Sequence, residues 1–414
     1  MSDASRPKWH RHELTYCANV HPGETFDEVR RVISYSVNGV RERRRIASMG
    51  TGLWLSQSVA AELREISRQG LEFIDLLNRC RLELFTLNGF PYGGFHSISL
   101  KERVYLPAWT EPARYDYTLD LAQLLAACLP EWQSEATIST VPLGYRYGWT
   151  IEQTRKAADT LCRLAAALER LHEVSGKRIR VCLEMEPDAA LESTDEAIVF
   201  FQRDLPEAAQ RARLKPELIR EYLGVCLDVC HQAVMFEDVA ASLARLRNAG
   251  IEIGKIQLSS ALEVIDPSDP EVRQVLQGFA EPRYLHQVRS QLGDGRVIGA
   301  RDLPIVLNDS AWATHAPWRI HFHVPLQISG FGNGALGTTR DQIGKVFDFL
   351  RNTSDSKPHL EIETYTWHVL PEELRPQTED GLLTSLVQEI QWVEAEMNER
   401  ELLHGSECDQ EISM

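Results

Sequence analysis

The amino-acid sequence predicts an α/β protein built as a single (β/α)8 barrel, the TIM-barrel architecture, with a lid segment inserted after the seventh strand. Short apolar runs of strand length alternate with long amphipathic helical patterns, the order typical of parallel βαβ units. The chain has 414 residues, enough for one large domain, and its 43% hydrophobic and 25% charged residues are the balance of a globular protein. Ionisable residues recur near the ends of the later runs, where a barrel gathers its functional groups.

Nine segments have the length and composition of strands, one more than the barrel requires. In chain order they are Leu14–Val20, Gly52–Ser56, Leu82–Leu87, Thr137–Val141, Ile179–Glu186, Gly224–Cys230, Ile253–Ser259, Arg319–Leu326 and Leu360–Thr366. We assign Arg319–Leu326 to an excursion from the barrel, because it follows an unusually long interruption with its own helical pattern. Long insertions in barrels usually lie in the loops that build the active site, so this one is expected to cover the barrel mouth.

The predicted organisation has three parts. An N-terminal extension at 1–13 precedes a barrel at 14–401, which carries the insertion at about 264–317. A disordered tail is expected at 402–414.

Helices are expected at Ser58–Cys80, Ile151–Val174 and Val239–Ala249, among others. The second of these has the clearest apolar stripe. Thr150 and Gln153 have the spacing of a capping box at its start.

Charge and cysteine usage exclude several classes of protein. The formal net charge is −16, so the chain would repel a phosphate backbone and no nucleic-acid partner is expected. The sequence has no signal-peptide pattern and no apolar run of membrane-spanning length, so a cytoplasmic protein without a transmembrane segment is expected. The eight cysteines lack paired metal-type spacing, which favours buried thiols over a disulfide framework.

Side-chain alternation directs ionisable residues of the later strands into the barrel. Each barrel strand sends one set of side chains to the helices and the other to the interior. Apolar neighbours around Glu184 and Glu186 leave both carboxylates inside, and the same pattern places Asp228 inside with His231 just past the strand end. Further inward-facing groups are Lys255, Gln257, His321, His323, Glu361 and Glu363.

These inward-facing groups together predict a divalent-metal site. Taken singly, a Glu-x-Glu or His-x-His motif is more often a solvated face or a packed pair than a ligand pair. Several such motifs on separate strands cannot all stay buried unpaired, so they must satisfy one another or a cation. Carboxylates, imidazoles and an amide oxygen at one mouth suit manganese, magnesium or zinc. Alternation does not decide which of these groups are metal ligands. Glu186, Glu361 and one of the histidines can instead hold substrate or pair with Lys255.

Several of these residues resemble the motifs of xylose-isomerase-like barrels, the superfamily of sugar epimerases, inosose dehydratases and endonuclease IV. The run Leu-Asp-Val-Cys-His at 227–231 resembles their sixth-strand LDxxH signature. Glu184 is similar to their fifth-strand glutamate and Glu363 to their eighth-strand glutamate. The segments 319–323 and 330–337 resemble the Asp-x-His and glycine loop of the endonuclease branch.

A closer resemblance covers nearly the whole chain, from about Leu14 to the final helix. The runs Asn-Gly-Phe-Pro-Tyr-Gly at 88–93, Ile-Ser-Thr-Val-Pro at 138–142 and Glu-Thr-Tyr-Thr-Trp at 363–367 look like those of the EboE family, the metabolite-traffic proteins E of the ebo gene cluster. This resemblance implies a role in metabolite traffic and partner proteins from the same gene cluster.

The superfamily resemblance implies metal ligands at Glu184, Asp228 and Glu363, with His231 close by as a substrate or metal contact. The full set of candidate metal ligands is Glu184, Asp228, Gln257, Glu363, His321 and His323.

The chain departs from the family pattern on three strands. Many relatives have a histidine where this chain has Gln257, a weaker and neutral ligand. Asn88 and Thr140 stand where the endonuclease branch has histidines, so a trinuclear zinc cluster is not expected.

The function predicted from this site is that of a sugar or polyol isomerase or epimerase that moves a proton next to a carbonyl. Glu184 and Glu363 are the candidate acid/base pair, and Lys255 or His231 could hold a hydroxyl or a developing oxyanion. The substrate would be a small sugar, polyol or related metabolite. A non-catalytic metabolite-binding or escort barrel is the alternative, and a metal-dependent phosphodiesterase is a third class.

The run Gly332–Gly337 matches the GxGxxG pattern of dinucleotide-binding folds. In those folds the first glycine follows its strand at once, whereas here Pro325–Ser329 intervene and no further βαβ unit follows. We therefore expect no nicotinamide site, although the loop could present backbone N–H groups to a phosphate.

Overall fold

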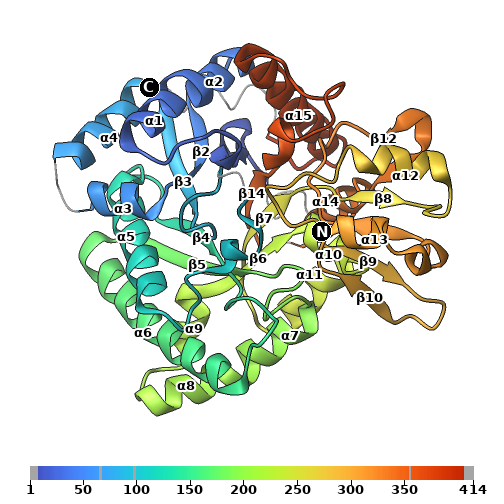
Figure 1. Cartoon of the computed structure of the whole chain (residues 1–414). Helices are drawn as coiled ribbons and strands as arrows, with labels where there is room; N and C mark the ends of the chain where they lie inside the picture. The colour runs from blue at the N-terminus through green and yellow to red at the C-terminus, as the bar shows by residue number, and fades with distance from the viewer. Residues whose placement is uncertain (1–7, 65–67, 97–98, 354–355, 405–414) are drawn as a thin grey trace.

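A computed structural model describes residues 8–64, 68–96, 99–353 and 356–404, and its central feature is an eight-stranded parallel sheet (Figure 1). The strands are β1 (Thr15–Tyr16), β2 (Met49–Trp54), β3 (Leu82–Asn88), β4 (Glu135–Thr140), β5 (Arg178–Glu184), β6 (Leu223–Asp228), β7 (Ile253–Leu258) and β14 (His359–Ile362). They lie in the order β1-β14-β7-β6-β5-β4-β3-β2, and every neighbouring pair is parallel. The predicted (β/α)8 barrel is confirmed.

The barrel closes between its first two strands at a glycine. Cys17, directly after β1, forms an isolated parallel bridge with Gly52 of β2. A Cβ atom on Gly52 would lie 1.5 Å from Oε1 of Glu361. A residue without a side chain is therefore required where the barrel wall approaches this interior carboxylate.

Helices flank the outside of the barrel (Figure 1). They are α1 (Phe26–Arg31), α2 (Asn38–Arg44), α3 (Gln57–Leu63), α4 (Arg68–Arg79), α5 (Pro112–Cys128), α6 (Ile151–Ser175), α7 (Thr194–Val199), α8 (Leu205–Ala212), α9 (Glu217–Tyr222), α10 (Val229–Val234), α11 (Val239–Asn248), α14 (Asp341–Arg351) and α15 (Glu379–Glu399). The predicted capping box opens α6, where Thr150 and Gln153 exchange backbone-to-side-chain hydrogen bonds. The single helix expected at Ser58–Cys80 is instead α3 and α4, because Arg64 has an extended backbone that ends α3.

The insertion between β7 and β14 forms a second sheet beside the barrel, coloured yellow to orange in Figure 1. Its elements are β8 (Leu262–Val264), α12 (Pro270–Gln277), β9 (Val288–Gln291), β10 (Val297–Ala300), α13 (Leu303–Leu307), β11 (Trp318–Ile320), β12 (Gly330–Phe331) and β13 (Leu336–Thr338). The excursion expected around Arg319 is confirmed, because β11 pairs antiparallel with β8 and β9 and not with a barrel strand. The sheet reaches from 262 to 338, beyond the expected 264–317, because both flanks supply strands to it.

The GxGxxG run lies in the turn of the antiparallel β12–β13 hairpin. Gly332 and Gly334 have φ values of +57° and +92°, left-handed conformations that glycine adopts without strain. The glycines therefore form a hairpin turn, and the run does not connect a strand to a parallel βαβ unit.

The two ends of the described chain meet beside the start of β14. Trp9 is buried, donates its indole N–H to the carbonyl of Pro358, and forms a parallel bridge with Leu403. Leu402 is buried as well, so the expected extension and tail are packed at 8–13 and 402–404. Residues 1–7 and 405–414 of those two segments lie outside the described residues. Within the described chain, every helix is too short or too polar to cross a membrane.

Candidate metal centre

Three carboxylates converge at the carboxyl ends of barrel strands. Glu184 ends β5, Asp228 ends β6 and Glu363 directly follows β14. One oxygen of each lies within 4.8 Å of the others, and all three side chains are buried. This convergence is the one that strand alternation predicts.

Asp228 has one oxygen with two hydrogen-bond donors and one oxygen without a partner. Its Oδ1 accepts a hydrogen bond from the backbone N–H of His231 (2.9 Å), and through this bond Asp228 caps α10. The same Oδ1 also accepts from the Ser259 hydroxyl (2.8 Å). Its Oδ2 is buried and has no hydrogen-bond partner. A buried oxygen of this kind is costly unless a cation or proton satisfies it.

Glu363 is held by two amides, whereas Glu184 keeps an unpartnered oxygen. Oε1 of Glu363 accepts from the side-chain amides of Asn19 (2.8 Å) and Asn88 (3.0 Å). Oε2 of Glu184 is buried without a partner. Burial raises the pKa of Glu184 and that of Glu363 well above their usual values, and the neighbouring carboxylates add to both shifts. The ionised carboxylates would thus repel one another, and a divalent cation between them would offset this repulsion.

Three histidines approach the same carboxylates, and each is tied through its Nδ1 atom. His231 contacts the carbonyl of Met185 (2.9 Å), and His323 contacts the carbonyl of Glu363 (2.6 Å). His321 contacts Oε1 of Gln287 (2.7 Å). Each partner is an oxygen that accepts, so each Nδ1 carries the proton. Burial lowers the pKa of all three imidazoles, that of His231 to about 4, so they are neutral near pH 7.

It follows that each Nε2 atom is a bare lone pair. Nε2 of His231 and Nε2 of His321 lie 3.0 Å apart, and Nε2 of His323 is buried without a partner. Two lone pairs facing each other repel unless a cation or proton lies between them. Two nitrogens that share one metal ion at about 2.0–2.1 Å are separated by about 3.0–3.4 Å, which this spacing matches.

The histidine groups overlap with the carboxylate group. Asp228, His231 and His323 form one set with mutually close ligand atoms, and Glu186, His231 and His321 form another. Burial raises the pKa of Glu186 to about 8, although hydrogen bonds from Tyr105 and Gln287 oppose the shift. Asp228 belongs to both the carboxylate group and a histidine group, so it can bridge them.

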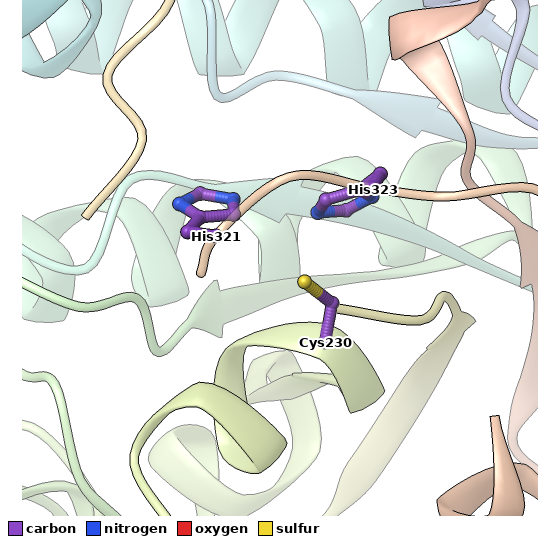
Figure 2. Close-up of side chains that lie close together, drawn as sticks. All are labelled: Cys230, His321 and His323. Carbon is purple, nitrogen blue, oxygen red and sulfur yellow. The ribbon is translucent and has the colours of Figure 1, made fainter. Parts of the chain in front are cut away.

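A cysteine faces the histidine pair from the other side. Figure 2 shows the thiol of Cys230, on α10, pointing toward His321 and His323. The three form a further set of close ligand atoms, and all are buried. Burial, with Asp228 next, raises the pKa of this thiol well above its usual value, so it is a neutral thiol in this arrangement.

Lys255 and Gln257, both singled out from the sequence, have partners of their own inside the barrel. Lys255 forms a fully buried ion pair with Glu361, with Nζ 2.6 Å from Oε2. Pairing with Lys255 is one of the alternatives that alternation leaves open, and Glu361 is the group that forms the pair. Oε1 of Gln257 accepts from the Cys226 thiol at 3.4 Å, so this oxygen already has a partner inside the barrel. Neither Lys255 nor Gln257 lines the pocket at the mouth.

That pocket is small and roofed by aromatic rings. Its volume is about 50 Å³, well below the roughly 300 Å³ at the lower end for ligand sites. Phe95, Tyr284 and Tyr365 pack together above it, with ring centroids 5.0–5.5 Å apart. Lys101, which lies between β3 and α5, donates to the carbonyl of Tyr284 and so connects that barrel segment to the insertion. Since Tyr284 belongs to the insertion, the inserted segment covers the mouth.

Sequence reasoning did not single out two residues that shape the centre. Asn19 lies on the inward side of the chain three residues after the two-residue strand β1, where alternation with Thr15 and Cys17 could have indicated it. Gln287 lies in the insertion, outside any barrel strand, so side-chain alternation along a barrel strand cannot indicate it.

No protein-family model matches the sequence, and no curated protein matches it. Several solved structures are similar to the chain. An L-ribulose 3-epimerase is 11% identical with a TM-score of 0.46, over 97% of this chain and 98% of that chain. A xylose isomerase domain protein from Planctomyces limnophilus is 10% identical with a TM-score of 0.46, over 95% and 99%. An IOLI protein with a bound zinc atom is 10% identical with a TM-score of 0.45, over 92% and 97%.

Strand order and register, which are independent of these similarities, establish the barrel. The closer resemblance to the EboE family stays a prediction.

Proposed function

We propose that this chain is a divalent-metal-dependent isomerase or epimerase of an uncharged sugar or polyol, acting by proton transfer next to a carbonyl. The observation that carries the proposal is the set of unpartnered ligand atoms at one mouth. Oε2 of Glu184, Oδ2 of Asp228 and Nε2 of His323 are all buried without hydrogen-bond partners. Other buried polar atoms also lack partners, but these three belong to residues whose ligand atoms gather within 4.8 Å of one another in groups.

The residues present fit a divalent metal. Glu184, Asp228 and Glu363 would supply oxygens, and His231, His321 and His323 would supply nitrogens. Mixed nitrogen and oxygen ligands favour manganese or zinc over magnesium, which prefers oxygens alone. When bound, the ion would polarise a substrate carbonyl and make the neighbouring C–H more acidic. We leave Gln257 out of this set because of its contact with Cys226.

Glu184 and Glu363 are the proposed proton-transfer pair. One carboxylate would take the proton from the carbon beside the carbonyl, and the other would return a proton to the substrate. The amides of Asn19 and Asn88 both donate to Oε1 of Glu363, so they fix its orientation and leave Oε2 as the atom for proton transfer. Burial of both carboxyls raises their pKa, which makes each a stronger base once ionised.

The pocket chemistry favours a substrate without a phosphate group. Among the described residues that line the pocket there is no lysine or arginine, while Glu184, Glu186 and Glu363 are present. A phosphate would meet carboxylates without a cationic side chain to pair with it. Phe90, Phe95 and Tyr365 instead offer apolar faces to the C–H face of a polyol.

A role in metabolite traffic, as a binding or escort barrel, is the second candidate. The aromatic residues that pack over the mouth support it, because a covered mouth suits capture as well as catalysis. A phosphodiesterase has less support. Three histidines are present, but Asn88 donates its amide to Glu363, and the described residues that line the pocket include no lysine or arginine to pair with a phosphate.

Solvent-deuterium exchange separates catalysis from escort. Protein purified without chelator would be loaded with manganese or zinc and incubated in D2O with unphosphorylated ketoses, which carry the carbonyl that the proton transfer requires. Deuterium entering a C–H beside the carbonyl, and lost in Glu184→Gln and Glu363→Gln, supports the isomerase. The Glu379→Gln variant, whose residue pairs with Arg31 away from the mouth, is the matched control. Tight binding of a compound with no deuterium entering any of them would support escort and refute catalysis.

A further inference from the structure

The insertion contributes a buried glutamine to the histidine group. Gln287 has no exposed surface and directly precedes β9. Its side-chain amide donates to the carbonyl of Pro187 (3.0 Å) and to the hydroxyl of Tyr105 (3.0 Å). Its backbone carbonyl accepts from the N–H of His321 (2.9 Å). Gln287 thus joins the insertion to the barrel loop after β5 and to His321.

The contacts of Gln287 determine which end of its amide faces His321. A main-chain carbonyl such as that of Pro187 can only accept a hydrogen bond, so the NH2 group must point toward it. The carbonyl end, Oε1, therefore points toward Nδ1 of His321, at 2.7 Å. Because Oε1 can only accept, the proton of His321 must sit on Nδ1, and Nε2 must be the lone pair.

His321 is the one member of the histidine group whose tautomer depends on a side chain. The Nδ1 atoms of His231 and His323 contact the main-chain carbonyls of Met185 and Glu363. A point substitution does not remove those carbonyls. Substituting Gln287 removes the nearest acceptor of His321 and leaves Oε1 of Glu186, 3.5 Å from Nδ1, as a longer and weaker alternative. A proton that moves to Nε2 would face His231 and block a shared ion.

From this arrangement we propose that Gln287 is a positioning residue that holds His321 in the tautomer required to bind metal. The inference rests on the proposed metal centre for its functional consequence, although the tautomer itself does not require a metal. Outer hydrogen-bond partners of metal-binding histidines typically contribute about 10–100-fold in metal affinity.

Two variants test the acceptor directly. Gln287→Met has similar length and no acceptor for Nδ1–H, so zinc or manganese affinity measured by calorimetry should fall about 10–100-fold. Gln287→Glu restores an acceptor at the same position and should recover most of the affinity. Gln342→Met is the matched control, because Gln342 is also buried but lies on α14 and donates to Asp341.

The metal-free protein provides an independent readout. Nitrogen-15 NMR of histidine-labelled protein reports which ring nitrogen of His321 carries the proton, with resonances assigned through a His321→Gln variant. Wild type should show Nδ1–H at His321, and Gln287→Met should show a mixture or Nε2–H.

An unchanged tautomer in Gln287→Met, or unchanged metal affinity where wild type binds metal, overturns the proposal. If wild type binds no metal but the tautomer follows Gln287, the proposed function fails while the positioning role stands. Where Gln287→Met does not fold, the wild-type spectrum alone tests the proposal. A wild-type His321 whose proton is on Nε2 overturns it.

Discussion

Lys255 and Glu361 form an ion pair inside the barrel, with Nζ 2.6 Å from Oε2 and neither side chain exposed. Burial alone lowers the pKa of Lys255, but the Glu361 carboxylate outweighs burial and the pKa is raised. The hydroxyl of Thr15 donates to Oε1 of Glu361 (3.4 Å), and Lys255 donates to Ser139 (3.4 Å). The pair and its neighbours Thr15 and Ser139 all lie inside the barrel, which indicates a structural role.

Lys255→Met should destabilise the fold, because it leaves the Glu361 carboxylate buried without its cation. Breaking a buried pair from one side costs about 3–5 kcal/mol. The double variant Lys255→Met with Glu361→Gln should recover much of that loss. Urea unfolding measures both. A Lys255→Met protein of unchanged stability that no longer turns over or binds a polyol would restore the substrate role expected from the sequence.

Gly52→Ala should be among the most damaging substitutions in the barrel. The added Cβ would lie 1.5 Å from Oε1 of Glu361 and 3.0 Å from Thr86, at the bridge that closes the barrel with Cys17. We expect a loss of about 3 kcal/mol or more, or failure to fold, measured by thermal and urea unfolding. Gly293→Ala is the control, because no atom lies within 4 Å of its Cβ position, and its effect should stay within about 0.5 kcal/mol.

His323→Gln should abolish metal binding, because it removes a buried nitrogen that has no other partner. Metal content by elemental analysis should fall to near zero, and added zinc or manganese should no longer raise the melting temperature. Asp228→Asn should act in the same direction while keeping the oxygen that caps α10. His315→Gln, at a histidine that packs on Trp312 outside the mouth, should retain the metal. Full metal content in both site variants would rule out this centre.

Glu389 gives a stability that depends on pH. It lies on α15, where it accepts from the Leu326 N–H (2.9 Å) and the Thr364 hydroxyl (2.7 Å), and so connects the segments that follow His323 and Glu363. Burial raises its pKa from 4.5 to about 7, although these hydrogen bonds oppose the shift.

Because the folded pKa of Glu389 is raised, its carboxyl stabilises the fold at pH below 4.5, and this contribution is lost as pH rises to about 7. Glu389→Gln keeps the accepting oxygen without the charge, so its stability relative to wild type should rise by about 2–3 kcal/mol between pH 4.5 and pH 7.5. Urea unfolding at both pH values measures this, with Glu399→Gln on the same helix as the control. A difference that does not change with pH would contradict the raised pKa.

Strand alternation was sufficient to predict the barrel and much of its mouth. Glu184, Asp228 and Glu363 each lie at or just past the end of an apolar strand, and the ends of parallel barrel strands must meet at one rim. The period of two is a local property of the chain, so it can be counted without the tertiary structure. The number of strand candidates showed that one was surplus to an eight-stranded barrel, and the long interruption before Arg319–Leu326 indicated which one.

The sequence by itself determined which residues face the barrel interior, but only the tertiary structure decided their partners. The pairing of Lys255 with Glu361 and the contact of Gln257 with Cys226 depend on how neighbouring strands are staggered. His321 joins His231 across 90 residues because the insertion folds into its own antiparallel sheet. Contacts between residues this far apart depend on the register and connection of whole elements, which a periodic pattern within one strand does not encode.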